Sequence, residues 1–481
     1  MKIQPQLLAL TAALLAVACV HVPDTAPRVR ALETRELGLG DTVYAVPSTE
    51  WWLLLDDPEL DRLVRSALER NPGFAASLAR VRGAWQQAIA AGAATRPQLD
   101  LDAYLYREHA SANFIYPPPF AGSEFWSGSL GINFAWQLDF WGRQAALIQQ
   151  TEQTARASGL DAAAAQLALS GSIAQAWVDL QRIQQLHGLA KRTHAQRAHI
   201  VDLSRRRVAA GLDSNVELRS SEYALAQADV EIEQLELARS RLVHAIAELS
   251  GDSAAVDHPL ADPTVDFEHA MRVPDYLPAD LLAHRPDVAA AKARVAAALA
   301  GQSAAEAAFY PNVNLVGFAG LMGISIEKIF QDDSQAWRVG PALHLPLFDA
   351  GRLKANYRRS VAEVDAAVAS YNQTVLRAVR EGADELARVA SLDRQVLEQQ
   401  RALAAAEDAY RFADQRYGAG ISSYLSVLNA ESQVIAARRR HANLMADRMQ
   451  GRIALLVALG GRFDSVAALI PTAANDKVTP P

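Results

Sequence analysis

The amino-acid sequence predicts a mainly helical, internally duplicated protein with a small membrane-spanning β part. Three observations predict this fold class. The second half of the chain repeats the first, each half carries a pair of amphipathic strand segments, and a long proline-free stretch follows each pair, over 142–208 and 351–417. No linker rich in Pro, Gly or Ser separates an independent block between about residue 50 and residue 463, so we expect one elongated unit.

Composition excludes several classes of protein. The net charge is -7 over 481 residues, and the Lys/Arg clusters are short, so we expect no nucleic-acid partner. After the first 20 residues no run reaches the length of about 18 apolar residues that a membrane-spanning helix needs. Any membrane crossing must therefore use strands.

The first residues have the pattern of a secretory signal. A short charged start, an apolar stretch over 7–17 and small residues before Cys19 predict a signal peptide over 1–18. This start resembles a bacterial lipoprotein signal, in which cleavage leaves the cysteine as an acylated N-terminus; the alternative is an ordinary signal with an incidental cysteine. Cys19 is the single cysteine of the chain, so we expect a covalent lipid on it, no disulfide and no other cofactor.

The duplication sets the order of the remaining elements. Three matching segments align when the second half is placed beneath the first: Pro97 with Pro311, Gly142 with Gly351, and Gly211 with Gly420. The first spacing is a few residues longer than the other two, and the Pro117–Pro119 tract places this extra length in a loop between two strands. The expected layout is a lipidated extended segment 19–57, a first repeat 58–250, an equatorial linker 251–284, a second repeat 285–463 and a tail 464–481.

Each repeat is expected to contain a helix, a β-hairpin and two long helices. The hairpins are expected at about 99–140 and 313–348, and the long helices at 142–208, 215–249, 351–417 and 423–460. From Ser129 to Phe140 the residues alternate between polar and apolar, which is the period of a strand with one apolar face. Strands of about ten residues with such a face can cross a bilayer when tilted.

Four strands are too few to close a membrane β-barrel, because single-chain barrels start at about eight strands and an open edge in hydrocarbon is costly. The chain must therefore oligomerise. Two copies would supply eight strands and three would supply twelve, and only the larger barrel leaves an open lumen. A soluble sandwich is the alternative, but long helices beside each hairpin do not suit it.

The long helices carry a seven-residue repeat. Val396, Leu403, Tyr410 and Tyr417 follow it in one helix, which predicts paired helices in a left-handed coiled coil, with an ordinary four-helix bundle as the alternative. At about 1.5 Å per residue, each proline-free stretch would span roughly 100 Å. Glycine-containing turns at Gly211 and Gly418–Gly420 end the coiled coils far from the strands.

These features resemble the TolC-like outer-membrane efflux ducts, and among them the NodT/OprM lipoprotein branch. The resemblance covers about residues 10–463 and is carried by Leu281–Val288, by Leu138–Arg143, and by Arg416–Gly420 followed by Ser423–Glu431. It implies a homotrimer, a twelve-stranded β-barrel that four strands per chain build, and a periplasmic α-helical tunnel of long coiled-coil helices. It also implies a lipid-anchored outer-membrane location, a periplasmic adaptor and an inner-membrane pump of the RND or another type.

The resemblance also implies two groups of site residues. The tips that contact the adaptor would be Gly211, Leu212, Asp213, Tyr417, Gly418, Gly420 and Ile421. The periplasmic aperture would be closed by Leu425, while Asn429 stands where the family carries an aspartate, so an anionic ring is not expected. The alternative is that both residues belong only to the coiled-coil core.

The sequence thus favours a passive channel of an efflux pump. No phosphate-binding loop, nucleophile elbow or closely spaced metal ligands support an enzyme, and His187 and His194 lie seven residues apart on a helix, a spacing more typical of structure than of metal binding. The alternative function is a periplasmic coiled-coil adaptor or scaffold, which heptads and tips would suit as well.

Overall fold

The structure is a computed structural model that describes residues 21–32, 50–115, 117–211, 213–252, 260–268, 285–419 and 421–460. The predicted signal peptide, Cys19, Leu212, Gly420 and the tail 464–481 lie outside the described residues, as does most of the expected linker 251–284. Contacts divide the chain into two compact units. One unit contains 82–157 and 291–371 with the residues before 32, and the other contains 50–81, 158–290 and 372–460.

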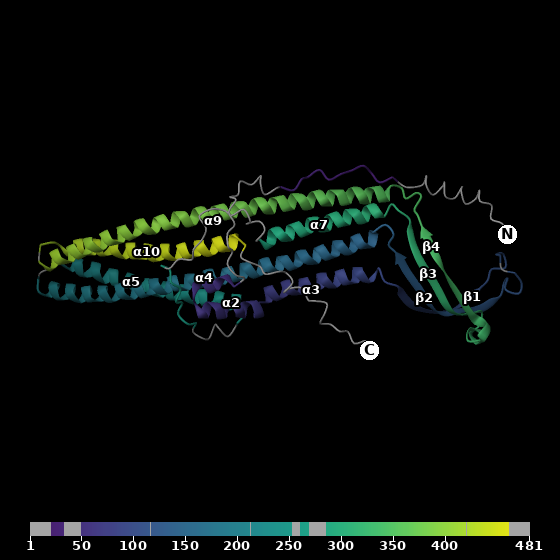
Figure 1. The fold of residues 1–481 in the computed structure, drawn as a ribbon. Coiled ribbons are helices and arrows are strands. Elements are labelled where there is room, and N and C mark those ends of the chain that lie inside the picture. The colour runs from purple at the N-terminus through teal and green to yellow at the C-terminus, as the bar shows by residue number, and fades with distance from the viewer. Residues whose placement is uncertain are drawn as a thin grey trace. The chain divides into compact units, whose positions relative to one another are not determined.

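The first unit contains one antiparallel sheet of four strands in the order β1-β2-β3-β4 (Figure 1). The strands are β1 (Gln98–His109), β2 (Glu124–Leu138), β3 (Asn312–Gly323) and β4 (Gln335–His344). β1 with β2 and β3 with β4 are the two expected hairpins, and a further ladder pairs β2 with β3 across the two repeats. Pro117–Pro119 lie in the loop between β1 and β2, as the sequence predicts.

The strand register gives the sheet one continuous apolar face. Leu101 pairs with Ile132, Ile132 with Ala319, and Ala319 with Trp337, so these side chains form a row across all four strands. Leu101 is 70% exposed and Trp337 is 78% exposed. A large apolar surface left open in this way marks a contact with lipid or protein.

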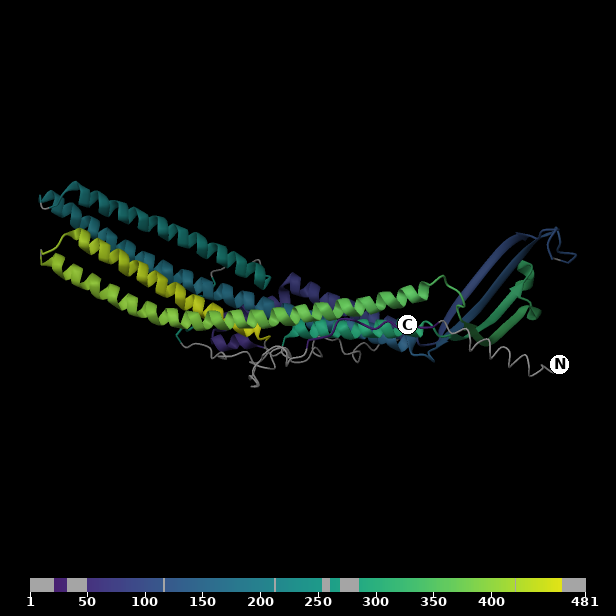
Figure 2. The same cartoon turned by 90° about the horizontal axis from the view of Figure 1, so that it is seen from above.

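Six long helices make up most of the described chain. They are α3 (Pro72–Ala93), α4 (Arg143–Ala209), α5 (Asn215–Ser250), α7 (Pro286–Ala307), α9 (Arg352–Gly418) and α10 (Tyr424–Ala458). In both views α5 runs beside the C-terminal half of α4, and α10 beside that of α9 (Figures 1 and 2). Shorter elements are η2 (Trp51–Leu55), α2 (Pro58–Arg70), α8 (Ile326–Ile329) and η4 (Asp332–Ser334). Within the described ranges, no helix has both the length and the apolar character needed to cross a membrane.

The two repeats start their longest helices with the same device. In the first repeat, the Asp139 carboxylate accepts hydrogen bonds from two backbone N–H groups at the start of α4, at 3.1 and 2.9 Å. In the second repeat, the Asp349 carboxylate accepts from the backbone N–H groups of Gly351 at 3.0 Å and Leu353 at 2.8 Å, at the start of α9. Gly142 and Gly351 turn the chain with φ of 72° and 89°. Because the chain already turns at these aspartates, β2 and β4 end a few residues before the ends expected for the hairpins.

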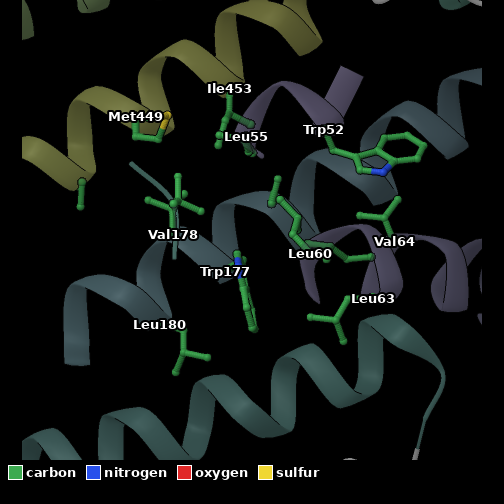
Figure 3. Packing of buried hydrophobic residues seen from close by; sticks show 14 of the residues in the cluster. Trp52, Leu55, Leu60, Leu63, Val64, Trp177, Val178, Leu180, Met449 and Ile453 are labelled. Carbon is green, nitrogen blue, oxygen red and sulfur yellow. The ribbon is translucent and has the colours of Figure 1, made fainter. Parts of the chain in front are cut away.

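The second unit has a core around Trp177 of α4, which is fully buried (Figure 3). Figure 3 shows Leu60 and Leu63 of α2 beside the indole, with Ile453 of α10 in the same cluster. The indole Nε1–H donates to the buried Asp57 carboxylate at 3.0 Å. Asp57 also accepts from the backbone N–H of Thr264 at 2.9 Å and from two N–H groups at the start of α2, so its side chain joins three segments. We call this cluster the Trp177 core.

Candidate functional site

Two turns join the long helices, and we call them the first tip (210–214) and the second tip (419–423). In the first tip, Gly211 takes a left-handed conformation with φ of 69°, which ends α4. Ser214 and Glu217 then form a capping box that starts α5. The same short segment therefore ends one helix and starts the next, which makes the turn tight.

The second tip has a different set of hydrogen bonds. The Ala419 N–H donates to the Gln415 carbonyl at 3.0 Å, and the Ile421 N–H donates to the Arg416 carbonyl at 2.9 Å. These bonds satisfy the last carbonyls of α9. Ile421 is 69% exposed at the end of this turn, so an apolar side chain is open to a partner.

Arg207 brings residues of the two tips together. Its guanidinium forms two hydrogen bonds with the Asp213 carboxylate, at 2.7 and 3.1 Å, and lies 5.4 Å from the centre of the Tyr417 ring. Asp213 and Tyr417 therefore meet on one arginine, although they come from different repeats. Arg207 was not among the expected tip residues. Its position one helical turn before Gly211 could have indicated that it lies at the first tip.

Leu425 and Asn429 lie one turn apart on the exposed side of α10. Leu425 is 63% exposed, and Asn429 is exposed as well. Val427 and Glu431, which point to the other side of the helix, are 4% and 3% exposed. Neither Leu425 nor Asn429 is packed in the core of its own chain, so both side chains are available to other copies of the protein.

Glu431 is a buried carboxylate for which the sequence analysis assigned no role. Both of its carboxylate oxygens are buried without a hydrogen-bond partner. Arg197 of α4 attracts this carboxylate, but its Nη1 donates to the Ala224 carbonyl at 2.8 Å. Tyr410 of α9, whose hydroxyl accepts from Gln196 at 2.5 Å, also faces the group. A buried, unsatisfied charge of this kind is destabilising.

We expect Glu431→Gln to stabilise α10 near the second tip at neutral pH. Burial raises the pKa of the Glu431 carboxyl, and attraction to Arg197 offsets this only in part. Because the pKa of Glu431 is higher in the folded state than its value of about 4.3 in the unfolded chain, the protonated carboxyl favours folding. This contribution is complete below the unfolded-state pKa and is lost as the pH rises through the folded-state pKa. Glutamine stays neutral, so hydrogen-exchange protection at the start of α10 should rise about 5- to 150-fold at pH 7.5, which corresponds to about 1–3 kcal/mol.

The effect of Glu431→Gln should shrink as the pH is lowered toward 4, because the raised pKa keeps the folded-state carboxyl increasingly protonated. Glu398→Gln on α9 is the matched control, because Glu398 is 67% exposed and its replacement should leave protection unchanged. Lower protection in Glu431→Gln at pH 7.5, or a difference that does not shrink toward pH 4, would contradict the destabilising role of the carboxylate.

The motif around Arg285 has a structural role in the second unit. The Arg285 guanidinium is almost fully buried. Its Nη2 lies 2.8 Å from the Asp287 carboxylate and 2.9 Å from the Glu381 carboxylate of α9. Nη1 also donates to the Ala458 carbonyl at the end of α10, at 2.9 Å. One arginine thus fixes the start of α7 to two other helices.

The two histidines singled out in the sequence lie beside carboxylates of α5. His187 Nε2 is 3.3 Å from Glu236, and His194 Nε2 is 3.0 Å from Asp229. Over the residues that the structure describes, no group of three or more His, Cys, Asp or Glu side chains could hold a metal ion. These histidines therefore contribute to the pairing of α4 with α5.

Comparisons with known proteins fit this architecture. The family model described as outer membrane efflux protein matches residues 63–252 and 277–461. Among relatives, the fusaric acid resistance protein FusA of Burkholderia cepacia is 31% identical over 72% of this chain and 67% of its own length. The pyoverdine export outer membrane protein OpmQ of Pseudomonas aeruginosa is 29% identical over 86% of this chain and 88% of its own.

Among solved structures, the outer membrane protein VceC of Vibrio cholerae superposes with a TM-score of 0.81 at 30% identity, covering 87% of this chain and 100% of that one. The predicted TolC-like fold class is confirmed, and these matches favour the channel over the coiled-coil scaffold. The family and its relatives are transport proteins of the outer membrane with a large periplasmic portion. The chain therefore belongs to the outer membrane efflux protein family and is the outer-membrane channel component of an efflux pump.

Proposed function

We propose that three copies of this chain close one channel that passively conducts small molecules out of the cell. The observation that carries this proposal is the open sheet. β1 and β4 lie at its two ends, so each leaves a row of backbone groups without strand partners in the described chain. In hydrocarbon, each such group costs several kcal/mol, so the exposed apolar face requires that the edges pair with other copies.

Three copies suit a channel better than two. Four strands per chain give eight strands in a dimer, and side chains fill the interior of an eight-stranded closed sheet. Twelve strands from a trimer leave a lumen through which water and solutes can pass. In this arrangement the long helices would continue the pore as a tunnel on the periplasmic side.

Partners would meet the channel at the tips. We infer that a periplasmic adaptor contacts Gly211, Leu212, Asp213, Tyr417, Gly418, Gly420 and Ile421, and that an inner-membrane pump of the RND or another type supplies the energy. A groove of about 770 Å³ lies near these tips, with Val216, Tyr223 and Leu428 in its lining. Val216 and Tyr223 are 71% and 68% exposed, as expected of an apolar surface that a partner covers.

The lipid on Cys19 would hold the N-terminus at the membrane. Each buried methylene contributes about 0.8 kcal/mol of membrane affinity, so more than one acyl chain makes the anchor nearly permanent. The strands of the closed assembly would also hold the protein in the membrane, so the lipid would act chiefly before the channel has assembled.

We expect the detergent-solubilised mature protein to have a protein mass three times that of one chain, which is the 52.0 kDa of the 481 residues less the mass of the signal peptide 1–18. Size-exclusion chromatography with light scattering measures this mass, and the trimer should persist in sodium dodecyl sulfate until the sample is boiled. A monomeric, detergent-free protein would favour the scaffold, and a dimer would contradict the twelve-stranded assembly.

A further inference from the structure

A cavity of about 390 Å³ lies in the first unit, where the strands end and the long helices begin. Both repeats contribute to it. Its lining includes Trp141 and Arg143 from the first repeat, and Tyr310 and Arg352 from the second. We call it the junction cavity. Its volume falls within the range of small-molecule sites.

One wall of the junction cavity is aromatic. The Trp141 and Tyr310 rings are stacked, with centroids 4.9 Å apart and planes at 18°. The indole Nε1–H donates to the Pro311 carbonyl at 2.9 Å, which fixes the ring against the start of β3. Trp141 is 52% exposed, so the stack leaves aromatic surface open for a planar ligand.

The carboxylates that line the cavity already have partners, whereas two of its arginines do not form salt bridges. Asp139 is occupied by the backbone N–H groups of α4, and Glu363 lies 3.5 Å from Arg359. Arg143 and Arg352, which occupy matching positions in the two repeats, form no salt bridge among the described residues; Asp349 attracts Arg352 from outside the cavity lining, but its carboxylate accepts backbone N–H groups at the start of α9. Two guanidinium groups therefore remain to bind an anion.

The cavity lies on the polar face of the sheet. Gln137 Nε2 donates to Asn312 Oδ1 at 3.3 Å, and Asn312 stands opposite His344 in the ladder of β3 and β4. All three residues line the cavity. In the proposed closed assembly this face is turned to the water-filled path, so cargo would pass the cavity on its way out.

We propose that the junction cavity binds small aromatic carboxylates and that the channel thereby favours anionic aromatic cargo. Arginine matches a carboxylate with two parallel hydrogen bonds, and the Trp141 face can stack on an aromatic ring. A neutral ring lacks the charge that the arginines recognise, and an aliphatic acid lacks the stacking surface. The binding site stands on the geometry of one chain, while its role in cargo choice rests on the proposed function.

The test is binding of radiolabelled benzoate to the detergent-solubilised full-length protein by equilibrium dialysis. The double variant Arg143→Gln/Arg352→Gln should weaken binding at least tenfold. Lys354→Gln/Arg358→Gln is the matched control, because it removes the same charge from exposed positions near the start of α9 that do not line the cavity. This control should bind benzoate as the parent protein does.

Competition defines the ligand class. Benzamide and cyclohexanecarboxylate should each displace benzoate at least tenfold less well than unlabelled benzoate does. Equal binding by the Arg143→Gln/Arg352→Gln variant, equal loss in the control, or equal competition by benzamide would overturn the site. Because binding is measured without conduction, and the trimer mass is measured separately, failure here would leave the proposed channel intact.

Discussion

Leu425→Ala is expected to raise the resting conductance of the channel in planar bilayers by at least tenfold. We propose that in the trimer three Leu425 side chains would meet at the periplasmic aperture and exclude water. Leu425 is 63% exposed in one chain and packs in no core of its own, so alanine removes the apolar closure with little loss of stability within the chain. Asn429 would remain as a polar ring with little charge.

Val216→Ala is the matched control for this experiment. Val216 is also an aliphatic residue near the tips, on α5, and is 71% exposed. Its replacement should leave the pore as tightly closed as in the parent protein. An unchanged, closed pore in Leu425→Ala would remove this residue from the gate, and equal leakage in both variants would indicate general loosening of the tips.

Trp177→Ala should cost the second unit about 3–5 kcal/mol, as removal of a buried tryptophan typically does, and thereby abolish most of the assembled protein. The indole is fully buried in a cluster that includes Leu60 and Leu63 of α2, and its loss also removes a hydrogen bond to the buried Asp57. Quantitative immunoblotting of outer-membrane fractions, without boiling, measures the surviving trimer.

Two variants separate packing from hydrogen bonding in the Trp177 core. Trp177→Phe keeps most of the apolar volume but loses the donor to Asp57, and should retain more trimer than Trp177→Ala. Asp57→Asn keeps the shape of the side chain but loses its charge. Hydrogen bonds from several N–H groups stabilise that charge and hold the pKa of Asp57 below its usual value in spite of burial. Trimer levels near those of the parent protein in Trp177→Ala would show that this core is not essential to the fold.

The fold class could be predicted because its signals are local. The alternation along β2 and the matching Gly142 and Gly351 before the proline-free stretches can each be recognised within a few residues of sequence. The duplication then supports each assignment a second time, since Gly142 and Gly351 occupy matching positions in the two repeats. The positions of the two turns followed in the same way, from glycines at helix ends, whereas the adaptor-contacting residues were named only from the family resemblance.

The buried polar contacts could not be predicted, because their partners are distant in the chain. Asp57 meets Thr264, and Arg285 meets Glu381, only once several helices have packed. Glu431 could have been suspected from its spacing, since the buried Val427 and Val434 lie four residues before it and three after it on one face of α10. Whether such a carboxylate has a partner depends on side chains of α4 and α9, which are distant in sequence, so no pattern near Glu431 predicts it.

The ladder between β2 and β3 sets the order of events after secretion. Gly128 pairs with Gly323 and Leu138 with Val313, so the first hairpin must wait for the second repeat to be exported before its inner edge is covered. Pairing between such distant segments is slow, and an uncovered strand edge is a template for aggregation. The inner edge of the first hairpin therefore stays open to aggregation in the newly exported polypeptide until the second repeat has arrived to cover it.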